Sequence, residues 1–380
     1  MKKVLILFLI IIFSFKVDAK ELVPNAKAAI LIDPDSKKIL FEKNIYDEVS
    51  VASLTKMMGL LLIFEQIEAG EIKYTDKVIA SANAASMGGS QIWLTEGEEL
   101  TVDEMLKGII MASANDGIVA MAEFVAGSEE AFVKMMNDKV KELKLLHTHF
   151  VNPTGLDEKG HYSSAYDLAI IASELMKHED VFKYTTLYED YLRKDTDNKF
   201  WLVNTNKLIK TYKGADGLKT GMTDDAGYCM AVTAKRNGMR LLAIVLGETE
   251  GKVRNSETAS LLDYGFNNYE MVTIKKKGEK VGEIKFTKAK PLKIDIILNE
   301  DINIIQNKGI IKKEYKSEVK LNNLRLPIKV GDTIGKLLIK DNNEIIKEVI
   351  LKSNQNMNKR GFFDLWSNIL KSIFTGDLVS

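Results

Sequence analysis

The sequence predicts an α+β protein in which one antiparallel sheet is built from both ends of the first 270 residues, with a helical region between them. Two hairpin patterns carry this prediction, over residues 28–41 and over residues 228–246, where an Asn-Gly turn joins the strands. Helical periodicity dominates residues 53–190. Short alternating strands follow from residue 271, and they predict a separate all-β domain.

The composition is that of a soluble globular protein. The chain has 380 residues, 46% hydrophobic and 28% charged, and its 53 Lys and Arg balance its 53 Asp and Glu. A neutral chain lacks the basic excess of a nucleic-acid binder. The single Cys229 excludes an internal disulfide and a zinc site built from cysteines, and the four histidines form no H-E-x-x-H pair. We therefore expect catalysis without a metal or a cofactor.

The two ends of the chain predict export and membrane contact. Residues 1–19 read as a signal peptide, with two lysines, an apolar run and a small residue at the cleavage site; the alternative is an uncleaved anchor. Residues 362–376 repeat apolar positions at three- and four-residue steps, which predicts an amphipathic helix too short to cross a bilayer. We expect this helix to lie at the outer face of the cytoplasmic membrane, the alternative being docking on the protein's own core.

Between these ends we expect two domains and a linker. Residues 20–270 form the α+β domain, residues 271–352 a small β-sandwich, and residues 353–361 a polar linker. Within the α+β domain, capping sequences that begin at Thr101 and Ser164 predict the starts of two helices.

A serine and a lysine stand one helical turn apart at Ser53-x-x-Lys56, just before a strongly apolar run. Serine becomes a nucleophile only when a base takes its proton, and a lysine serves as that base once burial or nearby cations depress its pKa. The spacing alone is a weak signal, because it recurs at Ser317-x-x-Lys320 in the predicted β domain, where we interpret it as chance.

Two further motifs follow in the chain. Ser113-Ala-Asn115 stands between two apolar helices, where Ser113 suits proton transfer and Asn115 suits a substrate amide; the alternative for Asn115 is a helix cap. Lys219-Thr220-Gly221 opens a strand and offers a positive charge, a hydroxyl and room for a substrate backbone; the alternative is a tight turn with a solvated lysine.

The three motifs together, in this order, are the signature of penicillin-binding proteins and class A β-lactamases. From about residue 28 to residue 266 the sequence resembles the low-molecular-mass penicillin-binding proteins that are D-alanyl-D-alanine carboxypeptidases, the serine peptidase family S11. The stretches 83–90, 152–157 and 263–266 contribute to this resemblance. It implies the serine β-lactamase/DD-peptidase-like fold for the α+β domain, and a β domain and an amphipathic tail are features of the same family.

The resemblance also implies a mechanism. Ser53 would form an acyl-enzyme on peptidoglycan stem peptides and on β-lactam antibiotics, with Lys56 as general base and Ser113 in the proton path. Lys219 and Thr220 would contact the substrate, Asn115 would hold its amide, and Gly221 would let its backbone approach. The backbone N–H groups of Ser53 and Met222 would form the oxyanion hole. Arg254, before the last helix, is the arginine candidate for the terminal carboxylate, the alternative being a surface salt bridge.

Two other functions compete with this assignment. A β-lactamase needs a deacylating glutamate, and the only E-x-x-L-N sequence, at residues 318–322, falls inside the predicted β domain. A wall-binding protein with a decayed site is disfavoured because all three motifs are intact. We therefore expect a carboxypeptidase.

Overall fold

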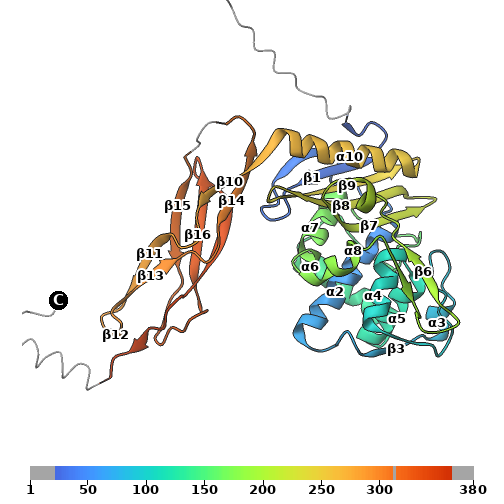
Figure 1. Ribbon diagram of the computed structural model, residues 1–380, viewed down its shortest axis with the longest axis horizontal. Coiled ribbons are helices and arrows are strands. Elements are labelled where there is room, and N and C mark those ends of the chain that lie inside the picture. The colour runs from blue at the N-terminus through green and yellow to red at the C-terminus, as the bar shows by residue number, and fades with distance from the viewer. Residues whose placement is uncertain (1–21, 311–313, 362–380) are drawn as a thin grey trace, which may run out of the picture. The chain divides into compact units, whose positions relative to one another are not determined.

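The computed structural model describes residues 22–310 and 314–361, which divide into two compact units between Asn267 and Asn268 (Figure 1). The predicted signal peptide, residues 1–19, and the predicted amphipathic helix, residues 362–376, lie outside the described residues. Among the helices that are described, none combines the length and the apolar character needed to cross a bilayer.

A five-stranded antiparallel sheet with the order β2-β1-β9-β8-β7 forms the centre of the first unit. Its first two strands come from the N-terminal hairpin and its last three from beyond the helical region, and Ala28 of β1 pairs with Leu246 of β9. The prediction of one sheet from both chain ends is confirmed. The strands are β1 (Ala28–Ile32), β2 (Ile39–Lys43), β7 (Ala215–Thr223), β8 (Gly227–Arg236) and β9 (Met239–Glu248).

The hairpin of β8 and β9 has the turn that its sequence predicts. Asn237 and Gly238 both have positive φ, 49° and 81°, as a type I′ turn requires. The turn fixes the register of β8 against β9, and β8 pairs with β7 on its other side. This leaves β7, which carries the Lys-Thr-Gly motif, at one edge of the sheet.

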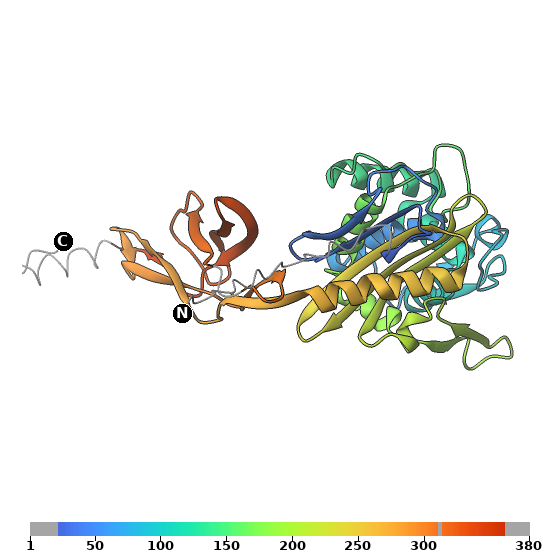
Figure 2. The same ribbon diagram turned by 90° about the horizontal axis from the view of Figure 1, so that it is seen from above.

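Helix α10 (Gly251–Asn268) runs along one face of the sheet (Figure 2). It begins well before the apolar sequence 261–266 that predicts it, so Arg254, expected before the helix, lies inside it. Glu257 of α10 and Glu248 of β9 are both buried. Burial first, and the Glu257 carboxyl second, raise the pKa of Glu248 to about 8.

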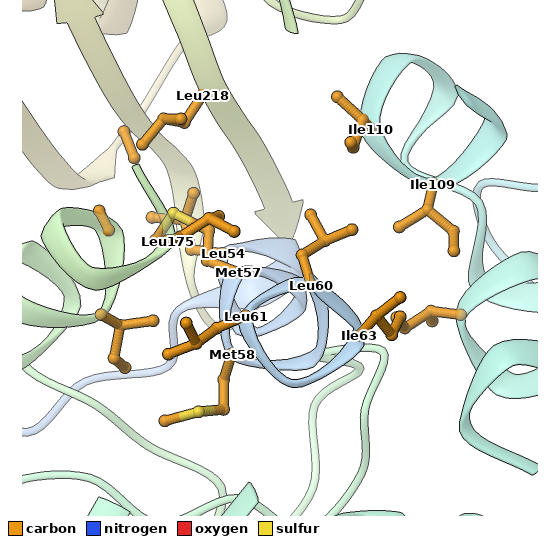
Figure 3. Close-up of a cluster of buried hydrophobic side chains, with 14 of the residues drawn as sticks. Leu54, Met57, Met58, Leu60, Leu61, Ile63, Ile109, Ile110, Leu175 and Leu218 are labelled. Atoms are coloured by element: carbon orange, nitrogen blue, oxygen red, sulfur yellow. The ribbon is translucent and has the colours of Figure 1, made fainter. Parts of the chain in front are cut away.

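The helical region covers the other face of the sheet, with α2 at its centre. The first nine residues of α2 are buried, because helices surround it, and its apolar side chains pack against Ile109, Ile110, Leu175 and Leu218 (Figures 1 and 3). The helices are α2 (Lys56–Ala69), α3 (Ala82–Ala85), α4 (Val102–Lys107), α5 (Asn115–Ala126), α6 (Glu129–Glu142), α7 (Ala165–Leu175), α8 (Phe182–Thr185) and α9 (Leu208–Thr211).

Both predicted helix starts are confirmed, but the region is less uniformly helical than its periodicity suggests. Thr101 and Glu104 form a capping box, and Ser164 caps α7. Residues 143–164 carry no helix, because Asn, Pro and Gly there favour turns. Short strands pair in two further places, as β3 (Lys77–Ile79) with β4 (Glu99–Thr101) and β5 (Glu189–Leu192) with β6 (Phe200–Val203).

In the described residues of the second unit that follow α10, every regular element is a strand, as predicted for the β domain, and these strands surround a core of their own. The sequence patterns missed β14 and β16, in which apolar and polar residues alternate less clearly, and the two-residue strands β12 and β18. The linker predicted at residues 353–361 is also wrong in part, because Met357 is fully buried and residues 358–359 pair with β12. The strands are β10 (Tyr269–Lys275), β11 (Lys280–Lys285), β12 (Ala289–Lys290), β13 (Lys293–Ile297), β14 (Ile302–Asn307), β15 (Lys316–Leu321), β16 (Thr333–Asp341), β17 (Glu344–Lys352) and β18 (Asn358–Lys359).

Candidate active site

Ser53 and Lys56 meet where a 3-10 turn leads into α2. Ser53 lies in the turn, η1 (Ala52–Thr55), and Lys56 is the first residue of the helix. Side chains three residues apart eclipse each other in a 3-10 turn. The Nζ atom of Lys56 accordingly lies 2.9 Å from the Oγ atom of Ser53, which remains partly exposed.

The environment of Lys56 favours the neutral amine. The side chain is fully buried, and burial first and the charge of Lys219 second hold its pKa well below the ordinary lysine value. Its Nζ atom also lies 2.6 Å from Asn115 Oδ1 and 2.6 Å from the carbonyl oxygen of Thr154. A neutral amine donates its two protons to these two oxygens, and its lone pair then faces the Ser53 hydroxyl.

Ser113 contacts a second buried lysine, Lys219, whose charge acts on Lys56. A π-helical turn, η2 (Gly108–Ala112), interrupts the predicted run after α4 and leaves Ser113 with a left-handed backbone, φ 64°. The Nζ atom of Lys219 donates to Ser113 Oγ at 2.7 Å and to the Thr220 carbonyl at 2.8 Å. Burial, and then the charge of Arg254, lower the pKa of Lys219 to about 7. The alternative of a solvated lysine is therefore wrong.

Asn115 links the lysine to a neighbouring loop and is not a helix cap. The cap of α5 is Ala114, and Asn115 is the first helical residue. Its Oδ1 atom accepts from Lys56, while its Nδ2 atom donates to the Gly88 carbonyl at 2.7 Å and its backbone N–H to the Ser90 carbonyl at 2.7 Å. The loop of residues 88–90 thereby forms one wall of the site.

Strand β7 lies directly against the turn that carries Ser53. A Cβ atom on Gly221 would come within 2.9 Å of the Ser53 backbone nitrogen and 3.0 Å of the Ala52 Cβ, so only glycine permits this approach. Thr220 Oγ1 donates to Thr205 Oγ1 at 2.8 Å, and Met222 is 55% exposed. An edge strand beside a nucleophile suits an extended peptide.

Arg254 is a buried cation and not part of a surface salt bridge. Only 8% of it is exposed, and it contacts Asn255 Oδ1 and, at 3.5 Å, the Cys229 carbonyl. It joins none of the ion pairs found in the described part of the chain. Its charge acts on Lys219, and burial raises the pKa of the Cys229 thiol to about 11, which fits a structural cysteine.

Sequence reasoning missed the residues that support the site from behind. The segment 152–157, noted only for its resemblance to the family, supplies the Thr154 carbonyl, and Gly155 packs so tightly on the Ala52 carbonyl that a side chain is excluded. The His161 ring contacts Thr55 Oγ1 at 2.8 Å and accepts a bond from a backbone N–H. Burial lowers the pKa of His161 to about 4.

Chance copies of the motifs belong to other elements. Ser317 and Lys320 are on β15 of the second unit, as is Glu318 of the E-x-x-L-N sequence. A second S-x-N sequence, Ser81-Ala-Asn83, also occurs in the chain, and its serine is the cap of α3. The interpretation of these copies as chance is consistent with their elements.

These contacts define a class of protein. The site combines a partly exposed serine, a buried lysine beside it, a second serine bonded to a second lysine, and a strand edge alongside. This is the arrangement that serine acyl transfer with a lysine base requires. The comparisons with known proteins place the chain within that class. Residues 16–250 match the D-alanyl-D-alanine carboxypeptidase family, Peptidase S11, and residues 269–359 match the C-terminal domain of penicillin-binding protein 5.

Characterised relatives agree with these matches over most of the chain. The D-alanyl-D-alanine carboxypeptidase DacF of Bacillus subtilis (strain 168) is 50% identical over 343 residues, 90% of this chain and 88% of that protein. DacA of Escherichia coli (strain K12) is 33% identical over 359 residues, 92% and 88% of the two chains. The chain therefore belongs to the D-alanyl-D-alanine carboxypeptidase family of serine peptidases.

Solved structures give the same result. A peptidoglycan synthesis regulatory factor (PBP3) from Streptococcus pneumoniae is similar with a TM-score of 0.74 at 28% identity, covering 88% of this chain and 99% of that one. Penicillin-binding protein 5 from Haemophilus influenzae is similar with a TM-score of 0.70 at 29% identity, covering 88% and 98%. The fold expected from the resemblance is thus confirmed for the α+β domain and the β domain.

Proposed function

We propose that this chain removes the terminal D-alanine from peptidoglycan stem peptides, with Ser53 as the nucleophile. One observation carries the proposal, the 2.9 Å contact between Ser53 Oγ and the buried amine of Lys56. Because burial favours the neutral lysine, its lone pair is available for the serine proton. The family to which the chain belongs supports this reaction and the identity of the substrate.

In the acylation step the Ser53 oxygen bonds to the carbonyl carbon of the D-Ala-D-Ala peptide bond while its proton passes to Lys56. The carbonyl oxygen becomes an oxyanion, which the backbone N–H groups of Ser53 and Met222 stabilise. The close packing of Gly221 on Ser53 supports this pairing of donors from two elements. Preorganised donors of this kind are worth several kcal/mol in a transition state.

The leaving amine needs a proton as the C–N bond breaks. Ser113 and Lys219 are proposed to carry the Ser53 proton onward from Lys56 to this amine, which returns Lys56 to its neutral form. Lys219 bonds directly to Ser113, and its lowered pKa, about 7, makes proton transfer easy near neutral pH. Free D-alanine then departs. Water attacks the ester carbonyl while Lys56 accepts the water proton. As the ester C–O bond breaks, Lys56 gives this proton to the Ser53 oxygen, and both side chains return to their starting state.

Substrate recognition is proposed to follow the edge of β7. The stem peptide lies extended along this edge, where Gly221 leaves room for its backbone. Its terminal carboxylate meets the hydroxyl of Thr220 in the field of two buried cations, Lys219 and Arg254. Asn115 orients the peptide amide on the opposite side.

Penicillins are proposed to acylate Ser53 and to remain bound. They carry a reactive amide carbonyl and a carboxylate, as the peptide does. The E-x-x-L-N sequence that a β-lactamase would need for deacylation occurs only at residues 318–322, beginning on β15 of the second unit. Asp116, whose charge acts on Lys56, is buried and engaged with backbone N–H groups. This favours a penicillin target over a penicillin hydrolase.

The ends of the chain are proposed to place the enzyme outside the cytoplasmic membrane. Residues 1–19 direct export, and residues 362–376 hold the exported protein at the membrane surface as an interfacial helix. We expect the chain without residues 362–380 to stop co-sedimenting with anionic lipid vesicles while it keeps its peptidase activity. Equal sedimentation of both forms would remove the tail from the proposal.

The catalytic proposal is tested by the release of D-alanine from diacetyl-L-Lys-D-Ala-D-Ala. We expect Ser53→Ala to lose activity by at least about 10⁴-fold, because no other group forms the ester. Ser317→Ala, in the chance S-x-x-K copy, is the matched control and should retain full activity. Activity that survives Ser53→Ala would reject Ser53 as the nucleophile.

A further inference from the structure

Trp93 is an exposed aromatic residue with a constrained backbone. It is 66% exposed, and its φ of 58° lies in the left-handed region. A bulky side chain rarely adopts this conformation, and exposing an indole to water is also unfavourable. Two such costs at one residue persist only where the surrounding structure fixes them, which is a feature of ligand-binding positions.

Two charged side chains fix the peptide units on both sides of Trp93. The carboxylate of the fully buried Asp116 accepts from the backbone N–H groups of Ile92, at 3.1 Å, and Leu94, at 3.0 Å. From the other side Arg193 donates to the carbonyl oxygens of Ile92, at 3.0 Å, and Trp93, at 3.4 Å. The indole is therefore presented on a rigid turn.

This turn continues the wall of the active site. Gly88 and Ser90, three to five residues before Trp93, bond to the side chain and backbone of Asn115, and Asp116 follows Asn115 directly. The turn of Trp93 is thus bonded to Asp116 and, through the loop before it, to Asn115, whose side chain contacts Lys56.

Trp93 also borders a hollow of about 810 Å³ whose charges nearly balance. The ring of Phe200 lines it as well. Arg193 is paired with Glu98, and the rest of the lining holds two cations, Lys77 and Lys199, and three carboxylates, Glu96, Glu99 and Glu104. A strongly anionic polymer finds no attraction there. A neutral ligand with an apolar face and several hydroxyl or amide groups fits the aromatic and polar lining.

We propose that Trp93 and this hollow bind an N-acetylated amino sugar of the glycan strand to which the stem peptide is attached. Such a sugar is uncharged, has an apolar ring face for the indole, and offers hydroxyl and acetamido groups to the polar lining. The inference rests on the proposed function, because it assigns a second contact to the same substrate. Trp93 is a specificity residue for glycan-linked peptide and takes no part in bond breaking.

The test compares two substrates in each variant. One is a stem pentapeptide on a tetrasaccharide of the glycan, and the other is the sugar-free diacetyl-L-Lys-D-Ala-D-Ala; the readout is the ratio of their kcat/KM values. We expect Trp93→Ala to lower this ratio about tenfold and Trp93→Phe to lower it less. Trp201→Ala is the matched control, because Trp201 is 56% exposed but does not line the hollow, and its ratio should not change.

The outcomes separate this inference from the proposed function. Loss of activity on the sugar-free peptide in Ser53→Ala concerns the proposed function alone. An unchanged ratio in Trp93→Ala, or equal losses on both substrates, would overturn the sugar site. As a direct measurement, N-acetylglucosamine tetramer should quench the tryptophan fluorescence of Trp201→Ala and not that of Trp93→Ala; quenching that persists without Trp93 also overturns it.

Discussion

Gly221→Ala is the most informative change at the site, because one added methyl group tests whether β7 and the Ser53 turn form the oxyanion hole together. The Cβ atom of Gly221→Ala would lie 2.9 Å from the Ser53 nitrogen, 3.0 Å from the Ala52 Cβ and 3.2 Å from the Val51 oxygen. Two of the three are backbone atoms, so no side-chain rotation relieves the contact. Since ordinary contacts begin near ~3.4 Å, β7 has to retreat by roughly half an ångström.

That retreat moves the Met222 N–H group relative to the Ser53 N–H group. Oxyanion donors act at about 2.7–3.1 Å, and the loss of one costs about 10²–10³ in kcat. We therefore expect kcat for D-alanine release by Gly221→Ala to fall by about 10²-fold. Overpacking of this kind costs about 1–3 kcal/mol of stability, so the folded protein persists and can be assayed.

Gly251→Ala is the matched control, because its Cβ atom would meet only the ring of Tyr228, at 3.3 Å, at the start of α10. It should keep full activity. The rates are to be measured well below the melting temperature of each variant, with the folded fraction checked by circular dichroism. Full activity in a folded Gly221→Ala would refute the reasoning that β7 and the Ser53 turn form the oxyanion hole together.

Three further predictions concern charge. Asn115→Asp places a carboxylate against Lys56, raises the lysine pKa and should slow acylation by penicillin about 10²-fold at neutral pH, while Asn83→Asp in the chance S-x-N copy should not. Glu248 keeps its proton to about pH 8 when folded but only to about 4.5 when unfolded, so stability falls as pH rises between these values; Glu248→Gln should remove this fall in melting temperature. The pKa of His161 is about 4 in the folded protein against an ordinary value of 6.5, so the stability of the fold falls as pH falls through this range. The melting temperature of His161→Gln should not show this fall.

The sequence was sufficient to predict the elements on which the site stands. Two hairpin patterns predicted the sheet. Three motifs predicted the residues of the site, because their order in the chain is the one found in a family with a known fold. It was not sufficient for backbone details. The π-helical turn that sets the conformation of Ser113 arises within a continuous apolar run, which has no local signal for it.

Residues that act through their backbone or through tertiary burial were also hidden. The Thr154 carbonyl accepts from Lys56 by virtue of position and not of residue type. The sequence left open whether Arg254 serves the site or a surface salt bridge, and only the packing of α10 shows that it is buried against β8. Likewise Met357 lies in a polar stretch that resembles a linker, and only the packed β unit shows it to be core.

The central claim, that Ser53 is the acylated nucleophile of a penicillin-sensitive peptidase, is tested most directly by intact-mass spectrometry after exposure to penicillin G. The account predicts a persistent gain of one drug mass in the exported chain and in Ser317→Ala, and no gain in Ser53→Ala. A gain that remains in Ser53→Ala would contradict the assignment of the nucleophile. An adduct that is lost quickly, with hydrolysed penicillin in solution, would contradict the carboxypeptidase in favour of a β-lactamase.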